Sequence, residues 1–200
     1  MQAAGGATLN ADEAAGGSAA PAAARGYSRA ALAVLALTAV LAVTLDQAVK
    51  AWATHHLTEG EPVRVLGGFI YLSLLRNGGA AFSLGSGFTW VFPLITVAVI
   101  GWIAWMGRRL RSVPWAVALG LVLGGALGNL ADRLFRAPGP FRGHVVDMIS
   151  LLAPYGRGFA IFNVADSCLT VGVVLAVLLE LTGRQRDGSR TRPAATERAA

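Results

Sequence analysis

The chain has few charged residues and almost no cysteine. Only 14% of its 200 residues are Asp, Glu, Lys or Arg, whereas 54% are hydrophobic. That balance excludes an ordinary soluble domain. The single cysteine, Cys168, excludes a disulfide framework and a thiolate metal cluster. His55 and His56 lack the His-Glu-x-x-His spacing of a zinc peptidase, so no metal site is predicted.

The excess of positive charge does not indicate nucleic-acid binding. The formal net charge is +6, but the arginines do not line one face of a domain. Nine of the sixteen lie in short clusters beside apolar runs: Arg25 and Arg29; Arg108, Arg109 and Arg111; Arg184, Arg186, Arg190 and Arg192. This distribution is typical of the cytoplasmic ends of membrane helices. We therefore expect membrane lipid, and no nucleic acid, among the partners.

Apolar runs of helical length predict a mainly α protein. A helix needs about 20 residues to cross roughly 30 Å of hydrocarbon. Four stretches have that length, at residues 30–51, 88–107, 113–132 and 159–181. The predicted fold is a bundle of four transmembrane helices.

Composition divides the chain into one membrane domain, residues 28–183, and two tails. Residues 1–27 are rich in Ala, Gly and Ser, and residues 184–200 are polar, so both tails are predicted to be disordered. Four crossings place both termini on one side, and the arginine clusters make that side cytoplasmic. A signal peptide cleaved near Ala51-Trp52-Ala53 is an alternative interpretation of the first span.

The two connections on the outer side differ in composition. In the first, residues 62–65 and 69–74 are rich in β-branched and aromatic residues, which predicts a small extracytoplasmic β-sheet. Asn77-Gly78-Gly79 then predicts a turn. The second, residues 134–158, is rich in Pro and Gly, which predicts an irregular extracytoplasmic loop able to move as a lid.

Polar residues far apart in the sequence converge near the outer surface in this topology. A fourth helix that begins near Phe159 and runs inward places Asp166 about 10 Å below that surface. Asp147 lies just before that helix. The outer ends of the first and third helices carry the remaining members of the group, Asp46, Lys50, Asn129, Asp132 and Arg133.

Asp147 and Asp166 are the candidate catalytic residues. An ionised carboxylate within a membrane span is costly, and such a residue suggests a function. Two neighbouring carboxyl groups hold one proton between them, an arrangement that hydrolyses peptide bonds without a metal or a nucleophilic serine. A structural interpretation stays open, in which Asp166 bonds a neighbouring helix and Asp147 caps one.

The supporting residues have structural alternatives as well. Asp46 and Lys50 are spaced as an i, i+4 ion pair on a helix. Asn163 shares a helix face with Asp166 and either orients it or bonds another helix. Further candidates are Asp132 and Arg133 as ion pairs that shape the site, Gly124 and Gly128 as close helix contacts, and Asn77, Gly79 and Ala80 as a docking segment for an extended substrate.

Taken in order, these motifs resemble the lipoprotein signal peptidase family, also called signal peptidase II. The resemblance covers about residues 30–181. It is carried by Asp46-Gln47-Ala48-Val49-Lys50, Asn77-Gly78-Gly79-Ala80-Ala81-Phe82-Ser83, Gly125-Ala126-Leu127-Gly128-Asn129-Leu130-Ala131-Asp132-Arg133, Val145-Val146-Asp147 and Phe162-Asn163-Val164-Ala165-Asp166-Ser167.

The resemblance implies a bacterial aspartic endopeptidase of the cytoplasmic membrane. Members cut prolipoproteins before a cysteine that bears diacylglycerol, near the outer face, without a metal or organic cofactor. Their catalytic aspartates match Asp147 and Asp166. Their supporting polar positions match Asp46, Lys50, Asn77, Asn129, Asp132, Arg133 and Asn163. We expect a monomer.

Two other classes of protein remain alternatives at this stage. Acidic residues in spans also serve proton relays, so a small proton-coupled transporter is one of them. Internal symmetry would favour a transporter, but the two halves of the chain show no repeat. The other alternative is a non-catalytic scaffold with four spans.

Overall fold

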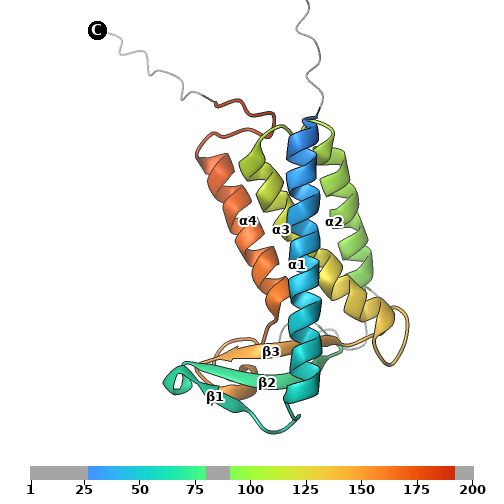
Figure 1. Cartoon of the computed structure of the whole chain (residues 1–200), viewed down its shortest axis with the longest axis vertical. Helices are drawn as coiled ribbons and strands as arrows, with labels where there is room; N and C mark the ends of the chain where they lie inside the picture. The colour runs from blue at the N-terminus through green and yellow to red at the C-terminus, as the bar shows by residue number, and fades with distance from the viewer. Residues whose placement is uncertain (1–26, 80–90, 192–200) are drawn as a thin grey trace, which may run out of the picture.

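The computed structural model describes residues 27–79 and 91–191. Four helices lie side by side, and a small sheet covers one end of them (Figure 1). We call this end the sheet end. We call the opposite end, where the arginine clusters lie, the arginine end. The elements in chain order are α1 (Arg29–His56), β1 (Val63–Val65), a 3-10 helix (Leu66–Gly68), β2 (Ile70–Asn77), α2 (Val91–Gly107), α3 (Val113–Phe135), β3 (Val145–Leu151), a second 3-10 helix (Pro154–Gly156) and α4 (Val164–Leu181).

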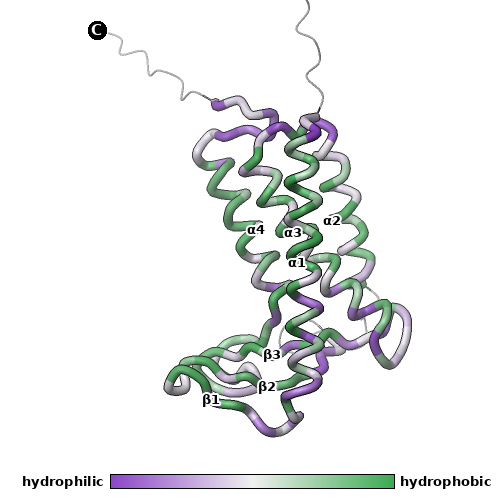
Figure 2. The backbone as a smooth tube through the Cα atoms, in the orientation of Figure 1, coloured by the Kyte–Doolittle hydropathy of each residue, from purple (hydrophilic) through white to green (hydrophobic). Residues whose placement is uncertain are grey.

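Three of the helices are long and apolar enough to cross a bilayer. These are α1, α3 and α4, whereas α2 has 17 residues and is a shorter apolar helix. At 1.5 Å per residue α2 spans about 25 Å, slightly less than the hydrocarbon layer. Hydrophobic residues follow all four helices between the two ends of the molecule (Figure 2). The described residues thus confirm a mainly helical membrane protein with three candidate spans.

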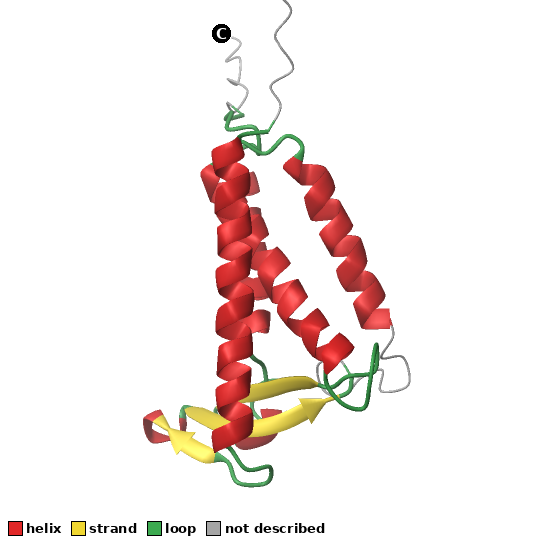
Figure 3. Ribbon diagram, turned by 45° about the vertical axis from the view of Figure 1, so that its right-hand side comes forward, coloured by secondary structure: helices red, strands yellow, loops and turns green. Residues whose placement is uncertain are grey.

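Helix α3 is central because glycines let its neighbours approach closely. A Cβ atom on Gly124 would lie 2.6 Å from Ala42 Cβ of α1. On Gly128 it would lie 2.6 Å from Asp46 Oδ2, and on Gly125 it would lie 2.8 Å from Leu169 Cγ of α4. The small-residue spacing therefore does what the sequence predicted. Figure 3 shows α2 standing apart from α1, with α3 inclined between them.

The sheet is antiparallel, in the order β1-β2-β3. The predicted strands at residues 62–65 and 69–74 correspond to β1 and β2 and are confirmed. The prediction of an irregular loop over residues 134–158 is wrong for β3, which pairs along β2 because its β-branched side chains suit a pleated sheet. This pairing sets Leu75 opposite Asp147 and Asn77 opposite Val145.

The fourth helix begins later than predicted. Its first residue is Val164, because the Asn163 side chain accepts the N–H of Asp166 and forms a capping box with it. The preceding Phe162 instead pairs with Ile149 of β3. Asp166 therefore lies in the first turn of α4, and the helix start near Phe159 from which its depth was predicted is wrong.

The structured chain also extends past the predicted boundary at residue 183. The indole N–H of Trp115 donates to the carbonyl of Arg184 at 2.7 Å. The N–H groups of Arg111 and Ser112 donate to the carbonyl of Arg186 at 2.9 and 3.0 Å. These bonds hold residues 184–191 against the start of α3, so a disordered tail from residue 184 is wrong for this part. The predicted tail regions 1–26 and 192–200 lie outside the described residues.

The first helix is continuous through the alternative cleavage site. Ala51, Trp52 and Ala53 are inside α1, and Ala53 is buried under the sheet. Lys50, one residue earlier, is fully buried. The packing of this segment supports a retained first helix.

Candidate active site

Asp147 lies in the middle of β3, at the sheet end of the bundle. Its side chain is only 2% exposed. The amide of Asn77, from β2, donates to Oδ2 at 3.0 Å, and the amide of Asn163 donates to Oδ1 at 2.7 Å. Both carboxylate oxygens are thus held by neutral amides.

Burial changes the acidity of Asp147. Loss of water raises the pKa of this carboxyl to about 6, and the charge of Asp166 adds to the rise. The hydrogen bonds from Asn77 and Asn163 lower the pKa and oppose the rise. Asp147 is therefore suited to take up and release a proton close to neutral pH.

Asp166 lies in the first turn of α4 and is also held by amides. The Asn129 amide of α3 donates to Oδ1 at 2.7 Å, and the backbone N–H of Asn163 donates to Oδ2 at 3.2 Å. The N–H of Asp166 donates in return to Asn163 Oδ1 at 3.0 Å. The helix cap thus fixes this side chain in its position.

Asn163 and Asn129 connect the two aspartates. Asn163 donates to Asp147 through its side chain and to Asp166 through its backbone. Its amide also lies 3.1 Å from Asn129 Oδ1, which accepts from Lys50 Nζ at 3.0 Å as well. Because Asn129 Oδ1 accepts from two donors, its NH₂ group is left to donate to Asp166.

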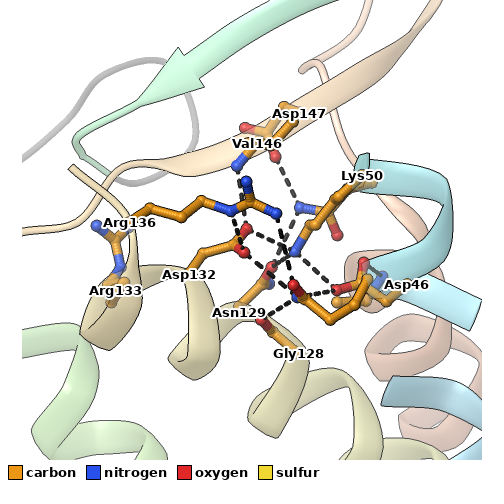
Figure 4. Close-up of polar contacts among 12 residues, drawn as sticks. Asp46, Lys50, Gly128, Asn129, Asp132, Arg133, Arg136, Val146 and Asp147 are labelled. Carbon is orange, nitrogen blue, oxygen red and sulfur yellow. Dashed lines mark hydrogen bonds and ion pairs between the residues drawn. The ribbon is translucent and has the colours of Figure 1, made fainter. Parts of the chain in front are cut away.

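An ionic cluster lies beside this amide network (Figure 4). It consists of Lys50, 2.8 Å from Asp46 and 2.9 Å from Asp132, all three almost fully buried. Arg136 adds an ion pair to Asp132 at 2.6 Å. The predicted pair Asp46–Lys50 and the predicted ion pairing of Asp132 are both confirmed.

The ionic cluster holds the backbone next to each candidate catalytic residue. Asp46 Oδ1 accepts the N–H of Ala165 at 2.9 Å, and Ala165 directly precedes Asp166. Asp132 Oδ2 accepts the N–H of Val146 at 3.1 Å, and Val146 directly precedes Asp147. Two structural carboxylates therefore each position the chain that carries a candidate catalytic carboxylate.

Arg133 holds two loops at the edge of the site. Its guanidinium donates to the carbonyl of Gly79 at 2.7 Å and to that of Gly143 at 3.4 Å. The N–H of Gly79 also donates to Asn77 Oδ1 at 2.9 Å. Gly79 is thus fixed beside the carboxylates, whereas the neighbouring candidate Ala80 lies outside the described residues.

A cavity of about 840 Å³ runs from this polar group along the helices. Asp147 and Asp166 both line it. Its remaining wall is largely apolar and includes Ile95 and Val99 of α2 and Leu169 of α4. Such a cavity suits a substrate that has both a polar bond to be cut and hydrocarbon chains.

Known proteins resemble this chain in both sequence and fold. The family model described as signal peptidase (SPase) II matches residues 38–182. The chain belongs to the signal peptidase II family. The lipoprotein signal peptidases of two bacteria show how similar this chain is to known relatives. That of Mycobacterium tuberculosis (strain ATCC 25618 / H37Rv) is 47% identical over 156 residues, which are 78% of this chain and 75% of that protein. That of Mycolicibacterium smegmatis is 45% identical over 171 residues, 82% of this chain and 71% of that protein.

Two solved structures share the fold of this peptidase. Both are described as bacterial membrane enzymes solved by the in meso method, at 2.3 and 1.9 Å resolution. The first has a TM-score of 0.67 and 29% identity, over 84% of this chain and 98% of the other. The second has a TM-score of 0.64 and 31% identity, over 78% and 96%. Membership of this family identifies the chain as a membrane peptidase and excludes the transporter and scaffold alternatives.

Every candidate site residue in the described segments lies in one connected group. Asp46, Lys50, Asn77, Asn129, Asp132, Asp147, Asn163 and Asp166 are linked by hydrogen bonds and ion pairs, and Arg133 binds Gly79 next to them. Among the described residues, His, Cys, Asp and Glu form no group of three that could hold a metal ion.

Two members of this group, Gln47 and Arg136, were not predicted from the sequence. The Gln47 amide lies within hydrogen-bond distance of Asp46, Asp132 and the carbonyl of Gly128, at 3.1 to 3.3 Å. Arg136 is the other member, and its guanidinium lies 2.6 Å from Asp132. Its spacing of four residues from Asp132 was a usable signal, and so was a glutamine inside an apolar helix.

Proposed function

We propose that this peptidase is an aspartic endopeptidase that removes signal peptides from prolipoproteins whose cysteine bears diacylglycerol. Asp147 and Asp166 are its catalytic dyad. The observation that carries the proposal is that both carboxylates line one cavity and bind the same residue, Asn163. The printed name of the relatives, lipoprotein signal peptidase, supplies the class of substrate.

The dyad acts with one proton shared between its two carboxyl groups. The ionised carboxylate takes a proton from water, and the protonated partner donates a hydrogen bond to the carbonyl of the scissile bond. Water then adds to the carbonyl carbon, and the carboxyl group that took the water proton passes a proton to the nitrogen of the leaving cysteine as the C–N bond breaks. The raised pKa of Asp147 favours retention of the shared proton near neutral pH.

The surrounding residues position the dyad and the substrate. Asn77, Asn129 and Asn163 orient the carboxylates, while Asp46 and Asp132, which share Lys50, hold the backbone before Asp166 and Asp147. Arg133 and Gly79 form the edge along which an extended peptide docks, with Ala80 next in the chain. No metal or organic cofactor takes part in this scheme.

The apolar wall of the cavity fits a substrate that is already in the bilayer. A cysteine with two acyl chains partitions into lipid, so it reaches the site by lateral diffusion. The signal peptide and the acyl chains then lie against residues such as Ile95, Val99 and Leu169. The enzyme works as a monomer on lipid-modified precursors.

The topology follows from the distribution of arginines. All four helices cross the bacterial cytoplasmic membrane, with α2 as the shortest. The arginine end, where α1 begins and α4 ends, lies in the cytoplasm by the positive-inside rule. The sheet end and the dyad then lie near the outer face. Residues 28–183 form the catalytic domain, with residues 184–191 packed against its arginine end, and the regions before and after the domain are cytoplasmic.

An in vitro cleavage assay with a diacylglyceryl-modified precursor peptide tests the dyad. Asp147→Asn and Asp166→Asn should each lower the cleavage rate more than about 10³-fold, because an amide cannot exchange the proton. Both variants should still accumulate in the membrane. Glu59→Gln, at an exposed ion pair with Arg76, is the matched control and should cleave normally. A near wild-type rate in either Asn variant would show that the dyad is assigned wrongly.

A further inference from the structure

A second cavity lies at the arginine end, far from the dyad. Its volume is about 450 Å³, and it opens between the end of α2 and the turn at residues 185–187. Trp105 and Met106 supply its apolar side, and three arginines with one aspartate supply its charged side. We call it the arginine pocket.

The turn that closes the arginine pocket is fixed in place. Its Arg186 carbonyl accepts the N–H groups of Arg111 and Ser112, and the Arg186 guanidinium lies 5.6 Å from the centre of the Trp115 ring. The bridge between Arg184 and Arg190 closes the turn on itself. Arg186 is therefore held at the wall of the pocket before any ligand arrives.

The other two arginines of the pocket are available for a ligand. Arg108 and Arg109 follow α2 directly and are exposed. Within residues 27–79 and 91–191, no ion pair involves either of them. Asp187, the pocket's one carboxylate, accepts from the N–H and hydroxyl of Ser189. The guanidinium groups of Arg108, Arg109 and Arg186 thus outnumber the one carboxylate, so the preformed pocket carries an excess of positive charge.

We propose that the arginine pocket binds the phosphodiester head group of an anionic glycerophospholipid. Guanidinium groups match phosphate oxygens with paired hydrogen bonds, and basic pockets at helix ends are suited to anionic head groups. The pocket also borders hydrocarbon, because Trp102 and Trp105 are 52% and 62% exposed on α2. Tryptophan favours the depth of the head groups, so the glycerol and acyl chains follow the α2 surface. That adjacent apolar face is why we infer a lipid rather than a soluble phosphate compound.

The test is a thermal-shift titration of the full-length protein in neutral detergent. Phosphatidylglycerol, phosphatidylcholine or inorganic phosphate is added, and the unfolding midpoint gives an apparent Kd. The Arg108→Gln, Arg109→Gln double variant should bind phosphatidylglycerol roughly thirtyfold more weakly, at about 1 kcal/mol per arginine. Arg142→Gln, Arg157→Gln removes the same charge from exposed positions at the sheet end and should bind like the wild type.

Each other outcome overturns the proposal. Equal stabilisation by phosphatidylcholine would show that head-group charge is not recognised, and an equal shift with inorganic phosphate would identify a soluble-anion site. Unchanged binding by the Arg108 and Arg109 double variant would place the lipid elsewhere. Cleavage by that variant at the wild-type rate in neutral detergent shows that it is folded and separates this test from that of the dyad.

Discussion

The sheet end of the bundle contains two pairs of aspartates with different surroundings. Asp46 and Asp132 share Lys50, and Asp132 has Arg136 in addition. Asp147 and Asp166 instead receive their hydrogen bonds from amides, those of Asn77, Asn129 and Asn163. The first pair is in direct contact with cations, whereas Lys50 acts on Asp147 only from a distance.

This difference matches the roles that we propose for the two pairs, with Asp46 and Asp132 as the scaffold pair and Asp147 and Asp166 as the catalytic pair. A carboxylate paired with a buried cation stays ionised, and its oxygens can hold backbone N–H groups permanently. A buried carboxyl group that meets only neutral donors can lose or gain a proton at moderate cost. The scaffold pair accepts the N–H groups of Ala165 and Val146, one residue before each member of the second pair. In the proposed mechanism it therefore positions the catalytic pair.

The largest effect on stability is expected from Lys50→Met. This change leaves Asp46 and Asp132 buried without their shared cation, which should lower the free energy of unfolding by about 3–5 kcal/mol. Thermal or denaturant unfolding in detergent micelles measures the loss. Asp166→Asn is the companion variant, and its loss should be no more than about 1 kcal/mol because the amide oxygen can still accept the N–H of Asn163 in the capping box. Equal destabilisation by both variants would remove the distinction between the two pairs.

Asn129→Ala should act mainly on catalysis. It removes the donor to Asp166 Oδ1 and the acceptor of Lys50 and Asn163. Loss of one positioned donor typically costs about 10²-fold in rate, so kcat/KM should fall by about that factor. Steady-state kinetics on the lipid-modified precursor measure it. Gln47→Ala is the control. Gln47 bonds Asp46 and Asp132 of the scaffold pair, so this variant should retain most of the activity.

Asn77→Ala should shift the pH dependence of cleavage. The raised pKa of Asp147 means that its proton is kept to higher pH, and the one-proton dyad is lost as the pH rises through the upper apparent pKa. The Asn77 hydrogen bond lowers that pKa, so its removal should move the alkaline limb of kcat/KM upward by about one unit. Arg76→Gln, one residue away and exposed, should leave the limb in place. A downward shift in Asn77→Ala would contradict the assigned role of this amide.

The smallest effect is expected from a chelator. Cleavage by an aspartate dyad requires no metal, so treatment with EDTA should leave the rate unchanged. Zinc-dependent recovery after chelation would instead identify a metallopeptidase. It would contradict the catalytic role that we propose for Asp147 and Asp166.

Local patterns in the sequence predicted the parts of the site that lie on single helices. The i, i+4 spacing of Asp46 and Lys50 predicted their ion pair. The shared helix face predicted for Asn163 and Asp166 is wrong, because Asn163 is the extended N-cap that precedes α4. Apolar runs predicted the helices, because hydrophobic length is a property of consecutive residues. The strands β1 and β2 were predictable from their β-branched residues in the same way.

Contacts between distant segments could not be predicted from local patterns in the sequence. The strand β3 was missed because flanking prolines and glycines suggested a loop, and only pairing with β2 gives its backbone partners. The start of α4 at Val164 depended on the cap at Asn163 and on the pairing of Phe162 with Ile149. The bond from Asp132 to Val146 likewise joins segments that the sequence alone does not bring together.

The sequence by itself thus determined the membrane character, the order of the helices and the acidic and amide residues available for a site. Only the tertiary structure decided which aspartates share a lysine and which are held by amides. The reason is physical: burial and partner charge set the behaviour of a carboxyl group, and both depend on residues brought together by folding rather than by sequence position.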